Sequence, residues 1–280
     1  MLATALFLVA LAPSPQPADT TVELRPGDRV VIEDLTGSLT VSAWDRDAIE
    51  VLSDGGDADI TVRRSGTTMR VARREGRRRG RSVDTTVRVP SWIDVEVGSR
   101  SMGVVVRGVG GTLDVRNVSG DVVIESVGGP VEVRSVGGEI RVTDASGGVR
   151  ASSQSDDVTL RRVSGPIEVH SGDGDIVLDD VRSASVRAEA QDGDVTFNGP
   201  ISTGGDYGFF VHDGDATIAV PEATDARVRV STFDGEFQSD FTVRVERFSA
   251  GRRFDFVLGD GGALVQIEVF DGDIRLLRKP

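Results

Sequence analysis

The chain has 280 residues, a formal net charge of −13 at pH 7, 38% hydrophobic residues and only 5% aromatic residues. This composition suits one large or two small soluble domains, with a core built mainly from Val, Ile and Leu, the residues that fit pleated strands. The absence of cysteine excludes a disulfide framework, a thiolate nucleophile and a lipid-anchoring cysteine, and the negative charge makes binding to nucleic acid or anionic lipid unlikely on electrostatic grounds.

The first eighteen residues are typical of a secretory signal peptide. Leu2 to Ala12 is an apolar run too short to span a bilayer comfortably, and a proline-rich stretch from Pro13 to Pro17 follows it. Cleavage near Ala12 or Ala18 would fit. No Lys or Arg precedes the apolar run, so an uncleaved membrane anchor stays open. We expect residues 1–18 to be a signal peptide, no other membrane span, and export to the periplasm or cell surface.

Residues 19–100 show strand-like triplets at loose spacing. Leu39-Thr40-Val41 and Val95-Glu96-Val97 are examples in which two aliphatic residues flank a third residue, the pattern of a half-buried strand. The rhythm breaks only between Ala72 and Thr86. We predict an N-terminal β-strand region, more open and sandwich-like, that is continuous with the repeats after it.

A cluster of arginines lies within this break. Arg77, Arg78 and Arg79 stand among six arginines between positions 73 and 81 of an otherwise acidic chain. They are a candidate binding site for an anionic glycan, lipopolysaccharide or nucleic acid. The alternative is a solvated loop without a ligand.

The segment from Leu113 to Phe197 contains an internal repeat. Ten aliphatic-any-aliphatic triplets follow each other at steps of nine residues, with one step of ten, and Gly, Asp and Pro clusters separate them. Alternate triplets match best, so the natural unit is a coil of about 18 residues with two strands. The sequence therefore predicts an all-β fold, a parallel β-solenoid (β-helix) over residues 101–280. Val122, Ile140, Val158 and Ile176 should then lie on neighbouring parallel strands.

Acidic residues recur at one corner of the predicted coils. An acidic residue directly precedes the strand in successive coils, and Asp-Gly-Asp spans the corner in several of them. Carboxylates stacked at the strand spacing of about 4.8 Å could bind Ca²⁺, whose preferred ligands are oxygens. The alternative is ordinary turn chemistry, in which each Asp hydrogen-bonds its own corner. The candidate calcium ligands are Asp173, Asp175, Asp192, Asp194, Asp213 and Asp215.

The C-terminal coils differ in composition. Ten of the eleven Phe residues lie between Phe197 and Phe270, and the coil spacing stretches to 21 residues. Wider coils need larger side chains to fill them. The alternative is an exposed aromatic binding surface, for which Tyr207, Phe209 and Phe210 are the candidates.

Three parts of the sequence resemble one known family. They are the opening Val31 to Asp45, the serial Gly-Asp-Val/Ile strands, and the ending Gly261 to Leu276. Together they resemble the bacterial putative-adhesin family of β-strand-repeat proteins, domain of unknown function 4097. The resemblance covers nearly all of the mature chain. It implies an exported or envelope-associated β-solenoid and no established catalytic residues.

No residue constellation identifies a reaction or a cofactor. The two histidines, His170 and His212, lie in no recognisable motif, and no Gly-x-Ser-x-Gly elbow or phosphate-binding glycine loop is present. We predict a non-catalytic binding or structural module, an adhesin-like or cell-envelope scaffold without a cofactor, whose partner is an envelope protein or a glycan. The alternative is a carbohydrate-active β-helix enzyme, a polysaccharide lyase or hydrolase.

Overall fold

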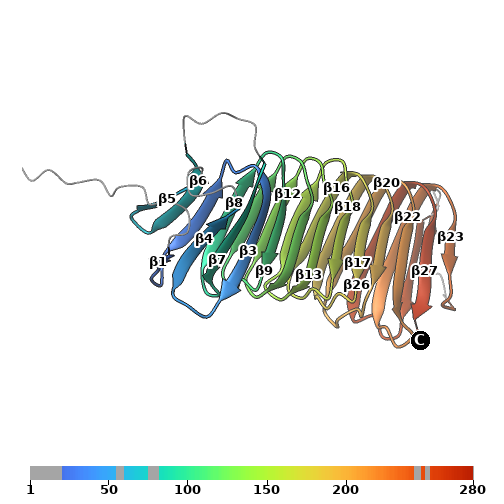
Figure 1. Ribbon diagram of the computed structural model, residues 1–280. Helices are drawn as coiled ribbons and strands as arrows, with labels where there is room; N and C mark the ends of the chain where they lie inside the picture. Colours follow the sequence, from blue (N-terminus) through green and yellow to red (C-terminus); the bar gives the residue numbers. More distant parts are fainter. Residues whose placement is uncertain (1–20, 55–59, 75–81, 243–246, 250–252, 280) are drawn as a thin grey trace, which may run out of the picture.

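The computed structural model describes residues 21–54, 60–74, 82–242, 247–249 and 253–279. All regular structure in these residues is β-strand, and the strands form one sheet of 13 and one of 14. Figure 1 shows the sheets running side by side along an elongated coil, from the blue N-terminal region to the red C-terminal region. The predicted all-β parallel solenoid is confirmed.

The 13-stranded sheet contains, in spatial order, β1 (Thr21–Glu23), β4 (Ala48–Ser53), β7 (Val83–Pro90), β3 (Gly37–Trp44), β9 (Met102–Arg107), β11 (Val122–Val127), β13 (Ile140–Ala145), β15 (Val158–Arg161), β17 (Ile176–Asp179), β19 (Val195–Asn198), β21 (Ala216–Pro221), β27 (Ile274–Lys279) and β23 (Phe237–Ser239).

The 14-stranded sheet contains, in spatial order, β24 (Arg247–Ser249), β25 (Arg253–Leu258), β22 (Ala226–Asp234), β26 (Ala263–Asp271), β20 (Asp206–Asp213), β18 (Ser185–Asp192), β16 (Ile167–Asp173), β14 (Val149–Ser153), β12 (Val131–Ser135), β10 (Leu113–Asn117), β8 (Asp94–Ser99), β2 (Arg29–Glu33), β6 (Thr68–Arg73) and β5 (Ile60–Ser65).

The register of the central strands follows the sequence repeat. Val122 pairs with Ile140, Ile140 with Val158, and Val158 with Ile176, always on neighbouring parallel strands. This confirms the predicted alignment. Each step of 18 residues returns the chain to the same place one strand further along, so equivalent side chains of successive coils form columns.

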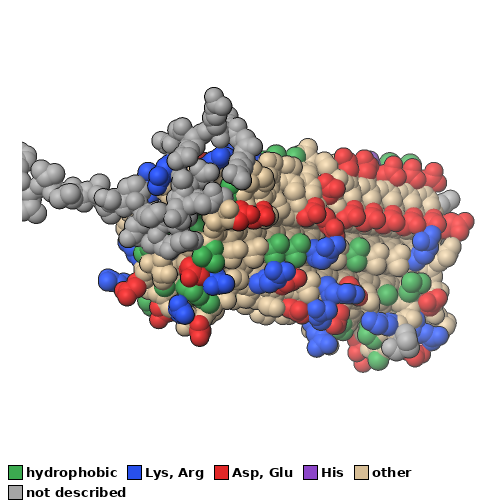
Figure 2. All heavy atoms as spheres, in the orientation of Figure 1, with side chains coloured by type: hydrophobic (Ala, Val, Ile, Leu, Met, Phe, Trp, Pro, Cys, Tyr) green, Lys and Arg blue, Asp and Glu red, His purple; other side chains and the backbone are tan. Residues whose placement is uncertain are grey.

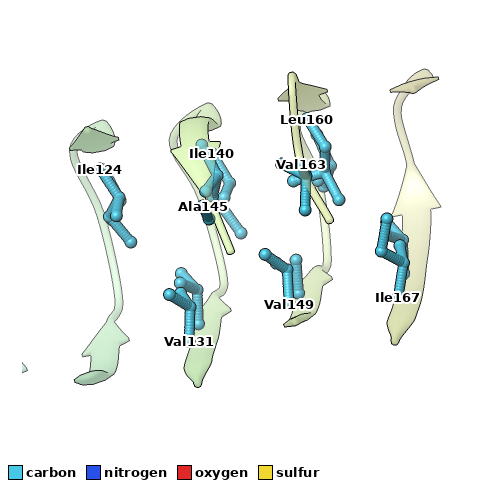
Figure 3. Close-up of a cluster of buried hydrophobic side chains, with 14 of the residues drawn as sticks. Ile124, Val131, Ile140, Ala145, Val149, Leu160, Val163 and Ile167 are labelled. Atoms are coloured by element: carbon cyan, nitrogen blue, oxygen red, sulfur yellow. The ribbon is translucent and has the colours of Figure 1, made fainter. Parts of the chain in front are cut away.

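The core lies between the two sheets. Successive side chains of a strand face opposite ways, so each triplet sends two aliphatic residues inward. Figure 3 shows Ile124, Ile140 and Leu160 of the 13-stranded sheet facing the space above Val131 and Val149 of the other sheet. All five are at most 3% exposed. The aliphatic columns therefore form one continuous core.

The aromatic residues of the C-terminal coils enlarge this core. Phe197 on β19 packs against Tyr207 and Phe209 on β20, with ring centroids 6.1 and 5.2 Å apart, and all three side chains are fully buried. Tyr207 aligns with the inward-facing Val186 of the neighbouring strand. Tyr207 and Phe209 fill the wider coils, so the expectation that they line an exposed binding surface is wrong.

Strand order departs from chain order at both ends of the solenoid. The first coil, β2 and β3, lies between β6–β7 and β8–β9, and the last coil, β26 and β27, lies between β20–β21 and β22–β23. Antiparallel strands cover three of the four sheet ends: β5 at one end and β25 with β24 at the other end of the 14-stranded sheet, and β4 with β1 at the N-terminal end of the 13-stranded sheet, whose other end is the three-residue β23. Such capping keeps long parallel edges from pairing with other chains.

Candidate functional site

An open groove runs along the outer face of the 14-stranded sheet near the carboxyl ends of its strands. Its volume is about 1110 Å³, and its lining residues come from β12, β14, β16, β18, β20, β26, β22 and β25. Because the strands pair in register, one column of outward side chains crosses all the central coils of the groove. In spatial order this column is Ser152, His170, Glu189, Phe210, Glu268 and Ser231.

Polar and charged contacts hold the middle of this column in place. His170 Nδ1 lies 3.0 Å from Glu189 Oε2, and Arg187 forms an ion pair with the same carboxylate. The guanidinium of Arg187 also lies 4.5 Å from the centre of the Phe210 ring. Of the three aromatic residues that the sequence suggested, Phe210 alone points outward, and it lines the groove.

A row of aromatic side chains forms one wall of the groove. His212, Phe270 and Phe233 come from the neighbouring strands β20, β26 and β22, and we call them the aromatic row. The ring centroids of His212 and Phe270 are 5.0 Å apart, and those of Phe270 and Phe233 are 4.9 Å apart. The Phe233 side chain is 72% exposed and that of Phe270 is 50% exposed.

These residues belong to a longer exposed column. Val118 and Val136 occupy the corresponding position after β10 and β12. In the described part of the chain, Val118, Val136, Phe233 and Phe270 are the four large hydrophobic side chains that are strongly exposed. At the same position Gln154, Gly172 and Gln191 separate the two valines from the aromatic row, so Phe233 and Phe270 form an exposed apolar patch of their own.

Two columns of carboxylates follow the aromatic row on one side, toward the corner of the coils. The first, which we call the outer acidic column, pairs in register across the coils as Asp173, Asp192, Asp213, Asp271 and Asp234. The second follows two residues later in each coil and comprises Asp175, Asp194, Asp215, Asp273 and Glu236. Figure 2 shows two rows of acidic side chains running side by side along the C-terminal half of the solenoid.

The second column links successive coils through hydrogen bonds. The backbone N–H of Asp194 donates to Asp175 Oδ1 at 2.8 Å, that of Asp215 to Asp194 Oδ1 at 2.8 Å, and that of Asp273 to Asp215 Oδ1 at 2.9 Å. We call this series the aspartate ladder. The sequence suggested that each Asp would bond its own corner, whereas the structure shows each carboxylate bonding the backbone of the next coil.

The candidate calcium ligands divide between the two columns. Asp173, Asp192 and Asp213 lie in the outer acidic column, while Asp175, Asp194 and Asp215 lie in the aspartate ladder. Among the residues that the structure describes, no group of three or more acidic, histidine or cysteine side chains has the geometry of a metal site. The other candidates, Arg77, Arg78 and Arg79, lie outside the described residues.

Ion pairs dominate the remaining outer faces of the solenoid. Arg150 pairs with Glu168 at 2.5 Å, and Arg116 pairs with Glu96 at 2.8 Å and with Asp114 at 2.6 Å. Burial raises the pKa of Asp114, with Arg116 acting against it. These outward charges neutralise one another across neighbouring strands.

The sequence contained a signal for the aromatic row that the repeat analysis missed. An aromatic or His residue directly precedes Asp-Gly-acid three times, beginning at His212, Phe233 and Phe270. Because residues at the same coil position stack, this pattern indicates a column. The stacking order was not predictable, since Phe270 lies between His212 and Phe233 in space but after both in the chain.

No helix occurs among the described residues, so none of them forms a helical membrane span.

A family model described as Toastrack DUF4097 matches residues 17–277 of the chain. No curated protein matches it.

Solved structures are similar to the chain at low identity. A putative adhesin from Bacteroides fragilis is 14% identical with a TM-score of 0.46, and the match covers 96% of this chain and all of that one. A putative adhesin from Parabacteroides distasonis is 10% identical with a TM-score of 0.47, over 92% of this chain and 95% of that one. A putative cell adhesion protein from Clostridium sporogenes is 11% identical with a TM-score of 0.27, over 95% of this chain and all of that one.

Proposed function

We propose that this chain, which belongs to the Toastrack DUF4097 family, is an exported, non-catalytic binding module that acts as an adhesin-like scaffold in the cell envelope. It presents the outer face of the 14-stranded sheet to an extended partner. The rigid ladder of coils supplies a long surface, and the groove near the carboxyl ends of the strands supplies the contact site.

The exposure of the aromatic row is the observation that carries this proposal. Phe233 and Phe270 face solvent although the neighbouring core accepts Phe197, Tyr207 and Phe209 completely. The exposed surface of a phenyl ring gains nothing from folding, and it contributes to binding when a partner removes it from water. The row also forms the wall of a groove long enough for several residues of a polymer.

The side chains in the groove support a binding role rather than a catalytic one. The carboxylate of Glu189 is shared between His170 and Arg187, and the Glu268 side chain accepts a hydrogen bond from Gln266 at 2.8 Å. These pairs orient the polar groups along the groove. They lie in a wide, solvent-open channel, whereas general acids and bases gain their altered pKa values from desolvation.

Binding to cell envelopes tests the proposal. The purified chain without residues 1–18 should sediment with envelope particles from cells of the organism that encodes it. The double variant Phe233→Ser and Phe270→Ser should lose at least about tenfold in affinity, because a few buried aromatic residues carry most of the energy of an interface. Equal sedimentation of the two proteins would contradict the assignment of the groove.

A matched control is the double variant Val118→Ser and Val136→Ser, which removes two exposed apolar side chains from the far end of the same column. Its envelope binding should stay close to that of the unmodified chain. A depolymerisation assay on envelope polysaccharide completes the test, since release of new reducing ends or unsaturated products would overturn the non-catalytic role.

A further inference from the structure

The three aromatic residues of the groove wall each precede a carboxylate of the outer acidic column. His212 is followed by Asp213, Phe270 by Asp271 and Phe233 by Asp234 in the sequence. Asp271 pairs in register with both Asp213 and Asp234. The aromatic row and the outer acidic column therefore run next to each other across three coils. Successive members of each are separated by the strand spacing of about 4.8 Å.

The outer acidic column differs from many other acidic groups on the surface in having no arginine partners. Elsewhere on the described sheets, many outward carboxylates are matched by arginines, as in the Asp179–Arg161 pair at 2.9 Å and the Asp144–Arg162 pair at 2.7 Å. Within the described residues, no ion pair or side-chain hydrogen bond involves any member of the outer column. All five side chains, Asp173, Asp192, Asp213, Asp271 and Asp234, are exposed.

The unpaired charge of the outer acidic column determines which class of partner can bind beside it. A file of unpaired carboxylates attracts cations and repels anionic polymers. A neutral sugar chain would desolvate the carboxylates without compensating their charge. Lys and Arg side chains suit both the aromatic row and the outer acidic column. Their apolar stems pack on aromatic rings, and their charged ends pair with a neighbouring carboxylate.

The dimensions fit an extended polypeptide. Five carboxylates at about 4.8 Å cover about 19 Å, and an extended chain rises about 3.3 Å per residue, so about six residues span the column. Alternate side chains of such a segment face the same surface. Three basic residues would then face the outer acidic column, and two of them would also lie against the aromatic row, which spans about 10 Å across three strands.

We propose that the groove binds an extended segment of a protein partner that is rich in Lys and Arg, with its stems on the aromatic row and its charges on the outer acidic column. This inference rests on the proposed function, and it names the class of partner for the same groove.

Fluorescence anisotropy with labelled synthetic peptides of about eight residues tests it. The probes are a peptide of alternating Lys and Ser, a peptide of alternating Glu and Ser, and a neutral chitin oligosaccharide of similar length. The Lys peptide should bind, and raising NaCl from about 0.02 M to about 0.3 M should weaken binding. Stronger or equal binding of the Glu peptide or the neutral oligosaccharide would overturn the inference.

Two variants locate the site, and a third controls for bulk charge. The triple variant Asp213→Asn, Asp234→Asn and Asp271→Asn and the double variant Phe233→Ser and Phe270→Ser should each weaken binding of the Lys peptide at least about tenfold. The control, Asp45→Asn, Asp206→Asn and Asp260→Asn, changes the net charge equally at exposed positions elsewhere. It should stay within about twofold of the unmodified chain.

The results separate this inference from the proposed function. An equal loss in the control triple variant would show attraction to the net charge alone and would overturn the proposed site. If the Lys peptide does not bind but envelope binding still depends on Phe233 and Phe270, the partner class is wrong and the binding function stands. If the Phe233→Ser and Phe270→Ser double variant also binds envelopes as well as the unmodified chain does, both proposals fail. Thermal unfolding of each variant verifies that it is folded.

Discussion

The Oδ1 atom of Asp194 accepts a hydrogen bond from the backbone N–H of Asp215, 2.8 Å away and one coil further along the solenoid. The same relationship joins Asp157 to Asp175 and Asp273 to Glu236, each at 2.9 Å. The acidic residue that recurs before each strand therefore satisfies a backbone donor of its neighbour. This explains why an acidic residue recurs directly before the strand in these coils.

Removing one step of the aspartate ladder should destabilise the fold. Asp194→Ala leaves the N–H of Asp215 without its acceptor and should lower the free energy of unfolding by about 0.5–1.5 kcal/mol. Asp194→Asn keeps an acceptor oxygen and should cost clearly less. Urea unfolding followed by circular dichroism measures both. Equal losses in the two variants would show that charge, and not the hydrogen bond, sets the contribution.

The glycine at this corner is required by the approach of two coils. Gly214 has a φ of 134°, and a Cβ there would lie 2.5 Å from the carbonyl oxygen of Gly193. Gly214→Ala should therefore combine backbone strain of about 1–3 kcal/mol with a steric clash. Gly66→Ala is the matched control, since Gly66 also has a positive φ but has open space around it. Thermal unfolding should show a larger loss for Gly214→Ala, and similar losses would contradict the close-approach argument.

The buried hydroxyl of Tyr207 makes two hydrogen bonds within the core. It donates to the backbone carbonyl of Ser183 and accepts from the backbone N–H of Ser202 at 2.8 Å. Tyr207→Phe keeps the ring but leaves both backbone groups without this partner, which should cost about 1–3 kcal/mol. Tyr207→Leu should cost more, because it also leaves a cavity beside Phe197. Denaturant titration distinguishes the two, and a neutral Tyr207→Phe would argue that water replaces the hydroxyl.

Acid should weaken the outer face of the 13-stranded sheet through Asp179. A hydrogen bond from Arg161 and a second one from Asn198 lower the pKa of Asp179 below its ordinary value of 3.8. A lowered pKa in the folded state stabilises the fold above the ordinary value, and this contribution is lost as the pH falls through the lowered one. The unmodified chain should therefore lose stability below about pH 4.

The variant Asp179→Asn isolates this effect. Its urea midpoint should be lower than that of the unmodified chain at about pH 6, and this difference should shrink as the pH falls below about 4, because it disappears once Asp179 is protonated. Asp45→Asn, at an exposed turn position, is the control. A constant difference between Asp179→Asn and the unmodified chain across this range would refute the assignment.

The regular part of the fold could be predicted from the sequence because its determinants are local. Steps of 18 residues fix both the register and the inward face, so Val122 and Ile140 were placed correctly. The same alternation places Tyr207 in an inward column with Val186, which agrees with the prediction that large side chains fill the wider coils and not with the alternative of an exposed aromatic surface. The length of the sequence repeat is enough to identify which side chains stack on one another when the coils follow each other in the chain.

The site was harder to predict because it depends on which coils are neighbours. β22 and β26 carry the same alternating pattern, and nothing local to either strand states that β26 pairs with β20. Without that order, Phe270 cannot be placed between His212 and Phe233. The wall of the groove is thus a product of non-local pairing, which triplet spacing does not encode.

The position of the last coil leads to a final prediction about truncation. In a solenoid whose coils stack in chain order, removing the terminal coil exposes only the coil before it. Here β26 lies between β20 and β22, and Val265, Ile267 and Val269 of β26 are buried, each contributing roughly 1.5–3 kcal/mol. Deleting residues 263–280 should therefore also release β22 and β25, which come earlier in the chain and attach to the rest of the sheet through β26.

Hydrogen exchange measured by mass spectrometry checks this expectation. In the truncated chain, amides of Ala226–Asp234 and Arg253–Leu258 should lose their protection, while those of β10, β12 and β14 should keep it and serve as the internal reference. The physical reason is that β22 has lost its parallel partner, and the antiparallel strands that remain, β22, β25 and the three-residue β24, no longer connect to β20 through the sheet. If the amides of β22 kept their protection from exchange, β22 would be able to pair directly with β20. The insertion of the last coil between β20 and β22 would then not be needed for the stability of the C-terminal end.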